Sequence, residues 1–147
     1  MSNEYIVSQI WDERFLSLAK LISTWSKDPN TKCGCVLVRW DKTIASVGFN
    51  GFPRSVSDDK RLLDRKKKHE IVLHAEENAI NFLQRKEDGL IAYCFPMIPC
   101  SHCAAVFVQN RVSMVVAPKT TRKNDCHLNF TTTRSLFKES GIILREV

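Results

Sequence analysis

The chain has 147 residues, of which 44% are hydrophobic, and it carries a formal net charge of +6. This length and hydrophobic content suit one domain with a substantial core, so we expect residues 1–147 to form a single domain. No stretch approaches the roughly 20 consecutive apolar residues that span a bilayer, which argues against a membrane protein. The positive charge favours anionic partners, either nucleotides or nucleic acid.

The first half of the chain predicts a helix followed by a strand hairpin. Asp12 is placed to cap a helix whose apolar side chains recur at helical spacing, namely Phe15, Leu18, Ala19, Ile22 and Trp25. The polar segment 26–31 ends this helix. Residues 33–40 and 43–48 are apolar runs that we expect as strands, and only Asp41 and Lys42 separate them, which favours a hairpin.

The densest basic run, Lys60-Arg61 followed by Arg65 to Lys68, comes after a loop over 49–57. Leucines and aspartates are interspersed in it, which is typical of an amphipathic surface helix rather than of a nucleic-acid-binding tail. The run contains no aromatic residue that could stack on bases. We therefore interpret it as a solvated helix face and expect no nucleic-acid partner.

The second half alternates helices and strands. The expected elements are a helix over about 75–86, a strand over 90–95, a helix over 104–110, a strand over 114–117, a helix over about 129–140 and a strand over 142–145. Residues 118–128 form a polar connection, and Gly141 is a typical residue for the end of the last helix. This order predicts an α/β fold, a three-layer α/β/α sandwich with a mixed five-stranded sheet.

Two short motifs carry the residues of a metal-activated water. His74-Ala75-Glu76, and Pro99-Cys100 with Cys103, match the H-x-E and P-C-x-x-C pattern of zinc-dependent nucleobase deaminases. One imidazole and two thiolates fill three tetrahedral positions of Zn²⁺, and water takes the fourth. The metal lowers the pKa of that water from near 16 to about 7. Glu76 can take the water's proton and pass it to the ring and the departing ammonia, so we interpret it as the catalytic residue.

The spacing of these residues supports one shared site. Cys100 and Cys103 are three positions apart and lie on one face at the start of a helix, where the helix dipole favours thiolates. His74 and Glu76 can reach the same cavity from an opening helical turn. We therefore expect two helix starts side by side at the ends of adjacent strands. The alternative is a buried histidine near a structural cysteine pair, with Glu76 on a solvated face, and the combined pattern disfavours it.

The other cysteines and the N-terminus indicate a reduced compartment. Cys33, Cys35 and Cys94 lie in apolar runs, where a free cysteine packs as a small hydrophobic residue. Residues 1–5 lack the basic and apolar regions of a signal peptide. We therefore expect a cytoplasmic protein with free thiols.

Four segments of the chain resemble the deoxycytidylate (dCMP) deaminase family, within the cytidine-deaminase-like superfamily. They are Trp11 to Phe15, Ser26 to Thr31, Gly48 to Pro53 and His74 to Ile80. The second resembles the family's Ser-Lys-Asp-Pro-x-Thr and the third its Gly-Tyr-Asn-Gly-x-Pro. The resemblance implies a zinc-dependent hydrolysis of dCMP to dUMP, with one zinc ion per subunit held by His74, Cys100 and Cys103.

The same resemblance implies substrate contacts outside the zinc motif. Asn50 would bind the sugar or base, although a turn asparagine beside a glycine is the alternative. The Ala75 N–H would meet the pyrimidine carbonyl. Lys27 and Arg54 are the candidates for the 5′-phosphate, with solvated surface charges as the alternative. Family members are commonly hexamers, and many respond to dCTP and dTTP, so we expect a homo-oligomer with possible nucleotide effectors.

The sequence also departs from the family pattern. Ser55 stands where members often carry glycine. If the turn needs a positive φ at this position, serine is unfavourable there, and this argues against effector binding. Residues 118–128 lack a tyrosine that often contacts substrate. Some relatives bind a second, structural zinc through an inserted set of cysteines and histidines, and residues 56–73 contain only His69 of these types, so one zinc is expected.

Three other functions remain open from sequence. The first is deamination of another nucleotide, such as dCTP or a modified dCMP, because the pocket details that separate them are not visible. The second is a nucleic-acid deaminase, which the charge favours and the missing aromatic residues disfavour. The third is a zinc-stabilised nucleotide sensor, which has little need for Glu76.

Overall fold

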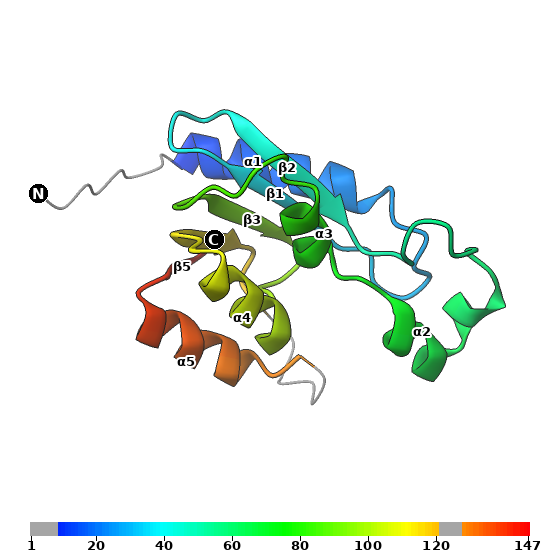
Figure 1. The fold of residues 1–147 in the computed structure, drawn as a ribbon. Helices are drawn as coiled ribbons and strands as arrows, with labels where there is room; N and C mark the ends of the chain where they lie inside the picture. The colour runs from blue at the N-terminus through cyan, green and yellow to red at the C-terminus, as the bar shows by residue number, and fades with distance from the viewer. Residues whose placement is uncertain (1–8, 121–127) are drawn as a thin grey trace, which may run out of the picture.

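A computed structural model of the chain describes residues 9–120 and 128–147, which are built around one five-stranded sheet (Figure 1). Its strands are β1 (Gly34–Val38), β2 (Ile44–Phe49), β3 (Ile91–Phe95), β4 (Met114–Ala117) and β5 (Ile143–Glu146), in the order β2-β1-β3-β4-β5. β1 is antiparallel to β2 and to β3, whereas β3, β4 and β5 are parallel. The predicted hairpin and the mixed five-stranded sheet are confirmed.

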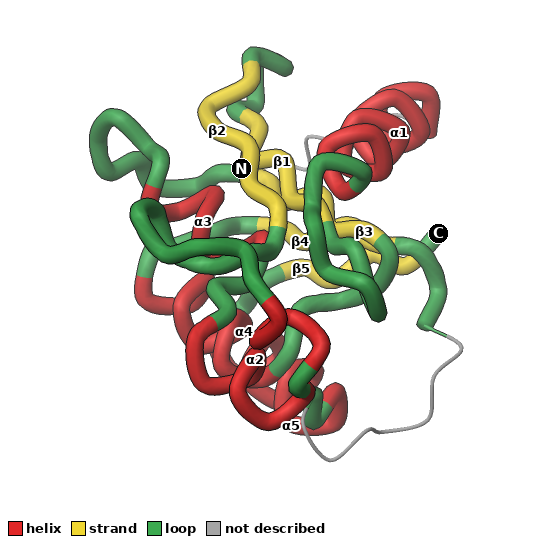
Figure 2. The backbone as a smooth tube through the Cα atoms, turned by 90° about the vertical axis from the view of Figure 1, so that its right-hand side faces the viewer, coloured by secondary structure: helices red, strands yellow, loops and turns green. Residues whose placement is uncertain are grey.

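Helices cover both faces of the sheet, as the three-layer prediction requires (Figures 1 and 2). α1 (Gln9–Ser23) lies on one face, and α3 (Ala75–Asn81), α4 (Ser101–Gln109) and α5 (Phe130–Ser140) lie on the other. The basic run forms a short 3₁₀ helix, η1 (Lys60–Leu63), followed by α2 (Arg65–Ile71). α2 projects at the end of the sheet where α3 begins, at the right of Figure 1.

The alternation of side chains along β1 separates the two core layers. Val36 and Val38 pack in the cluster that contains the apolar side of α1, whereas Cys35 and Leu37 pack in the cluster beneath α3, α4 and α5. All five β1 residues are buried. A strand buried on both faces reads as a continuous apolar run, which is why the sequence indicated this strand so clearly.

Two glycines let helices approach the sheet closely. A Cβ added at Gly34 would collide with the Ala19 carbonyl oxygen of α1, and one added at Gly48 would collide with the backbone of α3. The hydroxyl of Ser46 donates to the Ala79 carbonyl at 2.7 Å, and the Asn78 amide donates to the Phe49 carbonyl at 2.7 Å. The start of α3 is therefore fixed against β2.

Three local predictions are wrong. Asp12 does not cap α1, because this helix begins at Gln9. The Asp12 carboxylate is buried and accepts hydrogen bonds from the Tyr93 hydroxyl at 2.9 Å and from Arg145. α3 ends at Asn81 rather than near residue 86, and α4 begins at Ser101 rather than at residue 104. The earlier start of α4 places Cys103 in its first turn.

Among the residues that the structure describes, no helix has the length and apolar character that crossing a membrane would need. Residues 1–8 lie outside this part of the chain, and so do residues 121–127 of the connection between β4 and α5. The predictions for residues 1–5 and for most of 118–128 therefore fall outside the described residues.

Candidate metal centre and active site

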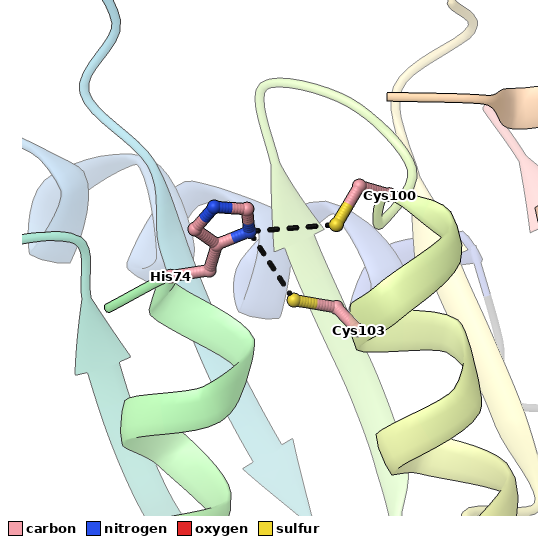
Figure 3. A group of neighbouring side chains, drawn as sticks. All are labelled: His74, Cys100 and Cys103. Carbon is pink, nitrogen blue, oxygen red and sulfur yellow. Dashed lines mark hydrogen bonds between the residues drawn. The ribbon is translucent and has the colours of Figure 1, made fainter. Parts of the chain in front are cut away.

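The starts of α3 and α4 bring three metal-binding side chains together (Figure 3). His74 is the residue before α3, Cys100 is the residue before α4, and Cys103 lies in the first turn of α4. The His74 Nδ1 atom is 3.4 Å from each of the two sulfurs. All three donor atoms lie within 4.8 Å of one another, so they can bind one ion.

Local hydrogen bonds hold these two helix starts in place. The backbone N–H of His74 donates to the Glu77 carboxylate at 3.2 Å, which fixes the backbone where α3 begins. The Thr133 hydroxyl of α5 donates to the Pro99 carbonyl at 2.9 Å, directly before Cys100. The Ser101 N–H donates to the Leu128 carbonyl at 2.9 Å. The ligands therefore rest on a framework that both helices and α5 share.

The protonation of the cluster matches the chemistry of a zinc site. Hydrogen bonds from Cys103 and His74 lower the pKa of Cys100 to about 4. The hydrogen bond between His74 and Cys100 raises the pKa of His74 to about 9. For Cys103, the hydrogen bond to Cys100 and the burial of the thiol raise the pKa. Two protonated groups, His74 and Cys103, therefore surround the Cys100 thiolate, and a divalent cation can replace the shared protons. An imidazole with two thiolates is a typical zinc donor set.

Glu76 lies in the first turn of α3, next to the cluster but outside its donor set. Glu76 is only 8% exposed, and this burial raises the pKa of its carboxyl above the usual range. A hydrogen bond with Cys103 acts in the opposite direction. A buried carboxyl with a raised pKa can both accept and return a proton.

A cavity of about 400 Å³ opens in front of these residues. His74, Ala75, Glu76 and Cys100 line one end of it. The remaining wall comes from the 28–33 loop, Asn50, the β3–α4 loop and α2. This volume lies within the range of about 300–1,000 Å³ that is typical of small-molecule sites.

Comparison with known proteins identifies the family. Residues 9–119 match the cytidine and deoxycytidylate deaminase zinc-binding region. The chain belongs to this deaminase family. An uncharacterized deaminase in the luxG 3′ region of Aliivibrio fischeri is 42% identical over 111 residues, which cover 76% of this chain and 74% of that protein. The deoxycytidylate deaminase of Mus musculus is 31% identical over 145 residues, which cover 92% and 79% of the two chains.

The fold of this deaminase family member is also found in a solved relative. The dCMP deaminase of cyanophage S-TIM5, in complex with dCMP and dUMP, superimposes with a TM-score of 0.79 over 95% of this chain and 98% of that chain. The two sequences are 23% identical, so this likeness concerns the fold. Together with the His74, Cys100 and Cys103 cluster, the family's zinc-binding region identifies a site for one Zn²⁺.

Asn50 lies in the cavity wall of this deaminase and also orders the neighbouring loop. Its Oδ1 accepts from the Cys33 N–H at 2.8 Å, and its Nδ2 donates to the Thr31 carbonyl at 2.9 Å. The Ser26 hydroxyl donates to the Asn50 carbonyl at 2.8 Å. One amide N–H and one oxygen lone pair remain for a ligand. Both sequence interpretations of Asn50, substrate contact and turn residue, are compatible with this position.

Two predicted phosphate contacts lie elsewhere. Lys27 does not line the cavity: its side chain is 72% exposed and pairs with Asp58 at 3.0 Å. Arg54 does not line it either, and its guanidinium lies 4.8 Å from the centre of the Phe82 ring. Ser55 has a φ of 67°, so a serine occupies a left-handed turn position that favours glycine.

Sequence reasoning missed the basic residues that do line the cavity. These are Arg65, Lys68 and His69 on α2. The interpretation of this run as a solvated face is wrong for Lys68, which is only 4% exposed. A spacing of three and four residues, followed by apolar Val72, was the available signal for a helix face turned toward the protein.

Proposed function

We propose that this protein is a zinc-dependent deaminase that converts dCMP and water into dUMP and ammonia. The observation that carries the proposal is the arrangement of Glu76 beside the His74, Cys100 and Cys103 cluster at one end of a single cavity. The mouse relative, which the chain matches over 92% of its length, is a deoxycytidylate deaminase, and this supports the choice of nucleotide.

His74, Cys100 and Cys103 would hold the zinc ion. When bound there, zinc supplies the Lewis acidity that makes water nucleophilic near neutral pH. The chain itself supplies the shape of the site, because α3 and α4 are both anchored to the sheet. The cluster leaves its open side toward the cavity, where His74 and Cys100 line the wall.

Glu76 is the proton carrier in this proposal. Its carboxylate accepts a proton from the attacking water as oxygen bonds to C4 of the pyrimidine, and passes that proton to N3. It then takes the second proton of the former water and delivers it to the amino nitrogen, so that the C4–N bond breaks and ammonia leaves. The burial of Glu76 keeps both transfers away from bulk solvent.

Ala75 and Asn50 are proposed to orient the nucleotide. Ala75 is the first residue of α3, so its N–H has no acceptor within the helix and can donate to the pyrimidine carbonyl. Asn50, on the loop after β2, can donate to or accept from the sugar or base with its remaining amide groups. Each lines the cavity next to the proposed reaction centre.

The test follows the ultraviolet change on deamination with dCMP, dCTP, CMP and deoxycytidine in parallel. Glu76→Gln keeps the size of the side chain and removes its proton-accepting group, so we expect turnover to fall about 100- to 10,000-fold while zinc content stays unchanged. Appreciable activity in this variant contradicts the assigned role of Glu76. Preferential turnover of dCTP replaces the proposed substrate with a triphosphate.

The finer partner assignments are also proposals. We propose a homo-oligomer, with a hexamer as the expected state. The exposed ring of Phe49, at the end of the edge strand β2, contacts the exposed ring of Trp25, and this apolar pair supports self-association. Light scattering after size exclusion measures the mass of the particle. dCTP and dTTP are tested as effectors in the same assay. A cytoplasmic location is proposed because Cys35 and Cys94 are buried thiols that form no disulfide.

A further inference from the structure

One face of α2 forms a wall of basic residues along the cavity. Arg65, Lys68 and His69 line the cavity, whereas their neighbours Lys66 and Lys67 do not. In Figure 2, α2 lies at the front of the molecule. The spacing of three and four residues puts the three lining side chains on one helix face.

Lys68 is the anchored member of this wall. Its ammonium donates to the Asp28 carboxylate at 3.1 Å and to the Asn30 side-chain oxygen at 3.0 Å. Asp28 is itself fixed, because the same Oδ1 accepts from the N–H groups of Asn30 and Thr31. An ammonium has three donors, so one N–H of Lys68 is left for a molecule in the cavity that Lys68 lines.

The cavity that Arg65 and Lys68 line is the one that Glu76 lines, so a single ligand can contact all three. Arg65 adds a second permanent positive charge and a planar set of N–H donors, which suits the oxygens of a phosphate. Asp28 offsets one of these charges, and the anchored Lys68 is therefore held in place at little cost in entropy when a ligand binds. A nucleotide with its base beside Glu76 has its anionic group at the opposite end.

We propose that Arg65 and Lys68, with His69 beside them, bind the 5′-phosphate of the nucleotide and give the enzyme its preference for nucleotides over nucleosides. This inference rests on the proposed function and names residues that it leaves unassigned. It also replaces Lys27 and Arg54, which lie outside the cavity.

The test measures binding of dUMP and of deoxyuridine by calorimetry to the zinc-loaded protein. The variants are Arg65→Gln and Lys68→Gln, and the matched controls on the same helix are Lys66→Gln and Lys67→Gln. We expect each cavity variant to weaken dUMP binding by about tenfold or more, because each loses a charged hydrogen bond, while deoxyuridine binding is unchanged. The controls bind both molecules as the unmodified protein does.

Unchanged dUMP binding in both cavity variants overturns the proposal. So does equal weakening of dUMP and deoxyuridine, because Lys68 then only orders the 28–33 loop. If Lys68→Gln lowers the melting temperature, the Arg65→Gln variant decides the question, because Arg65 is exposed and its replacement leaves the core intact. A second measurement then tests whether inorganic phosphate competes with dUMP for the unmodified protein. Failure of the proposed function is a separate result. In that case the unmodified protein does not deaminate dCMP, even if it binds dUMP more tightly than deoxyuridine.

Discussion

The two ends of the cavity are built in different ways. At the zinc end, all three ligands and Glu76 come from two helix starts; α3 is hydrogen-bonded to β2, and α4 packs in the core cluster on the same face of the sheet. At the α2 end, Lys68 is held by Asp28, which lies 40 positions away in the sequence. The first end is encoded in short motifs, whereas the second depends on a contact between distant segments. The reacting groups are thus held by helices packed on the core, and the residues proposed for phosphate binding lie on a projecting element.

The largest expected effect comes from removing a zinc ligand. Cys103→Ser should lose the metal and all measurable activity, because a neutral hydroxyl at this position replaces a thiolate. Cys94→Ala is the matched control, since Cys94 is equally buried, lies on β3 beneath the same helices and is not part of the cluster. Zinc is measured with a colorimetric chelator. Full zinc occupancy in Cys103→Ser would contradict the ligand assignment.

Zinc binding should also release protons, which sharpens the description of this end. At pH 7, His74 with a pKa near 9 is protonated, Cys100 with a pKa near 4 is already a thiolate, and Cys103 with its raised pKa is a thiol. Binding therefore displaces one proton from His74 and one from Cys103, about two in total. Apparent zinc affinity should fall as the pH drops below the pKa of His74, about 9, by up to about 100-fold per unit while both His74 and Cys103 are protonated.

Calorimetry of zinc binding in buffers with different ionisation enthalpies counts these protons. A value near zero would mean that the cluster is deprotonated before the metal arrives, in contradiction to the proton sharing around Cys100. The Glu76→Gln variant serves as the control, because it preserves all three ligands. Its proton count should stay within the error of the unmodified protein if Glu76 is not itself a zinc ligand.

This contrast explains how far the sequence could be interpreted. The His74, Cys100 and Cys103 set could be predicted because each ligand sits beside a helix start that its own motif specifies. The strands could be predicted because β1 and β3 are buried on both faces and contain continuous apolar runs. Lys68 was misinterpreted because its partner Asp28 is distant in sequence, and a basic run reads as solvated without it. Asp12 was misplaced for the same reason, since its partners Tyr93 and Arg145 are on β3 and β5.

Breaking the Asp28–Lys68 ion pair at the α2 end should reduce the free energy of unfolding by an intermediate amount. Asp28→Ala leaves a buried ammonium without its carboxylate and also removes the acceptor for the Asn30 and Thr31 N–H groups, so we expect about 3–5 kcal/mol of destabilisation. The double variant Asp28→Ala with Lys68→Met should be less destabilised than the single one, because no charge is left unpaired. Urea unfolding measures both. Equal destabilisation of the two variants would show that the loop hydrogen bonds, rather than the ion pair, hold this end together.

The smallest effect is expected at Lys27, and it separates a surface ion pair from the buried one. Lys27 pairs with Asp58 at a distance as short as that of Lys68 with Asp28, but its side chain is 72% exposed, against 5% for Lys68. Water and salt screen the exposed pair, so Lys27→Ala should change the free energy of unfolding by less than about 1 kcal/mol. The KM for dCMP should not change, because Lys27 does not line the cavity. A KM increase comparable with that of Arg65→Gln would mean that the loop carrying Lys27 turns toward the nucleotide when it binds, and the phosphate would then be shared between this loop and α2.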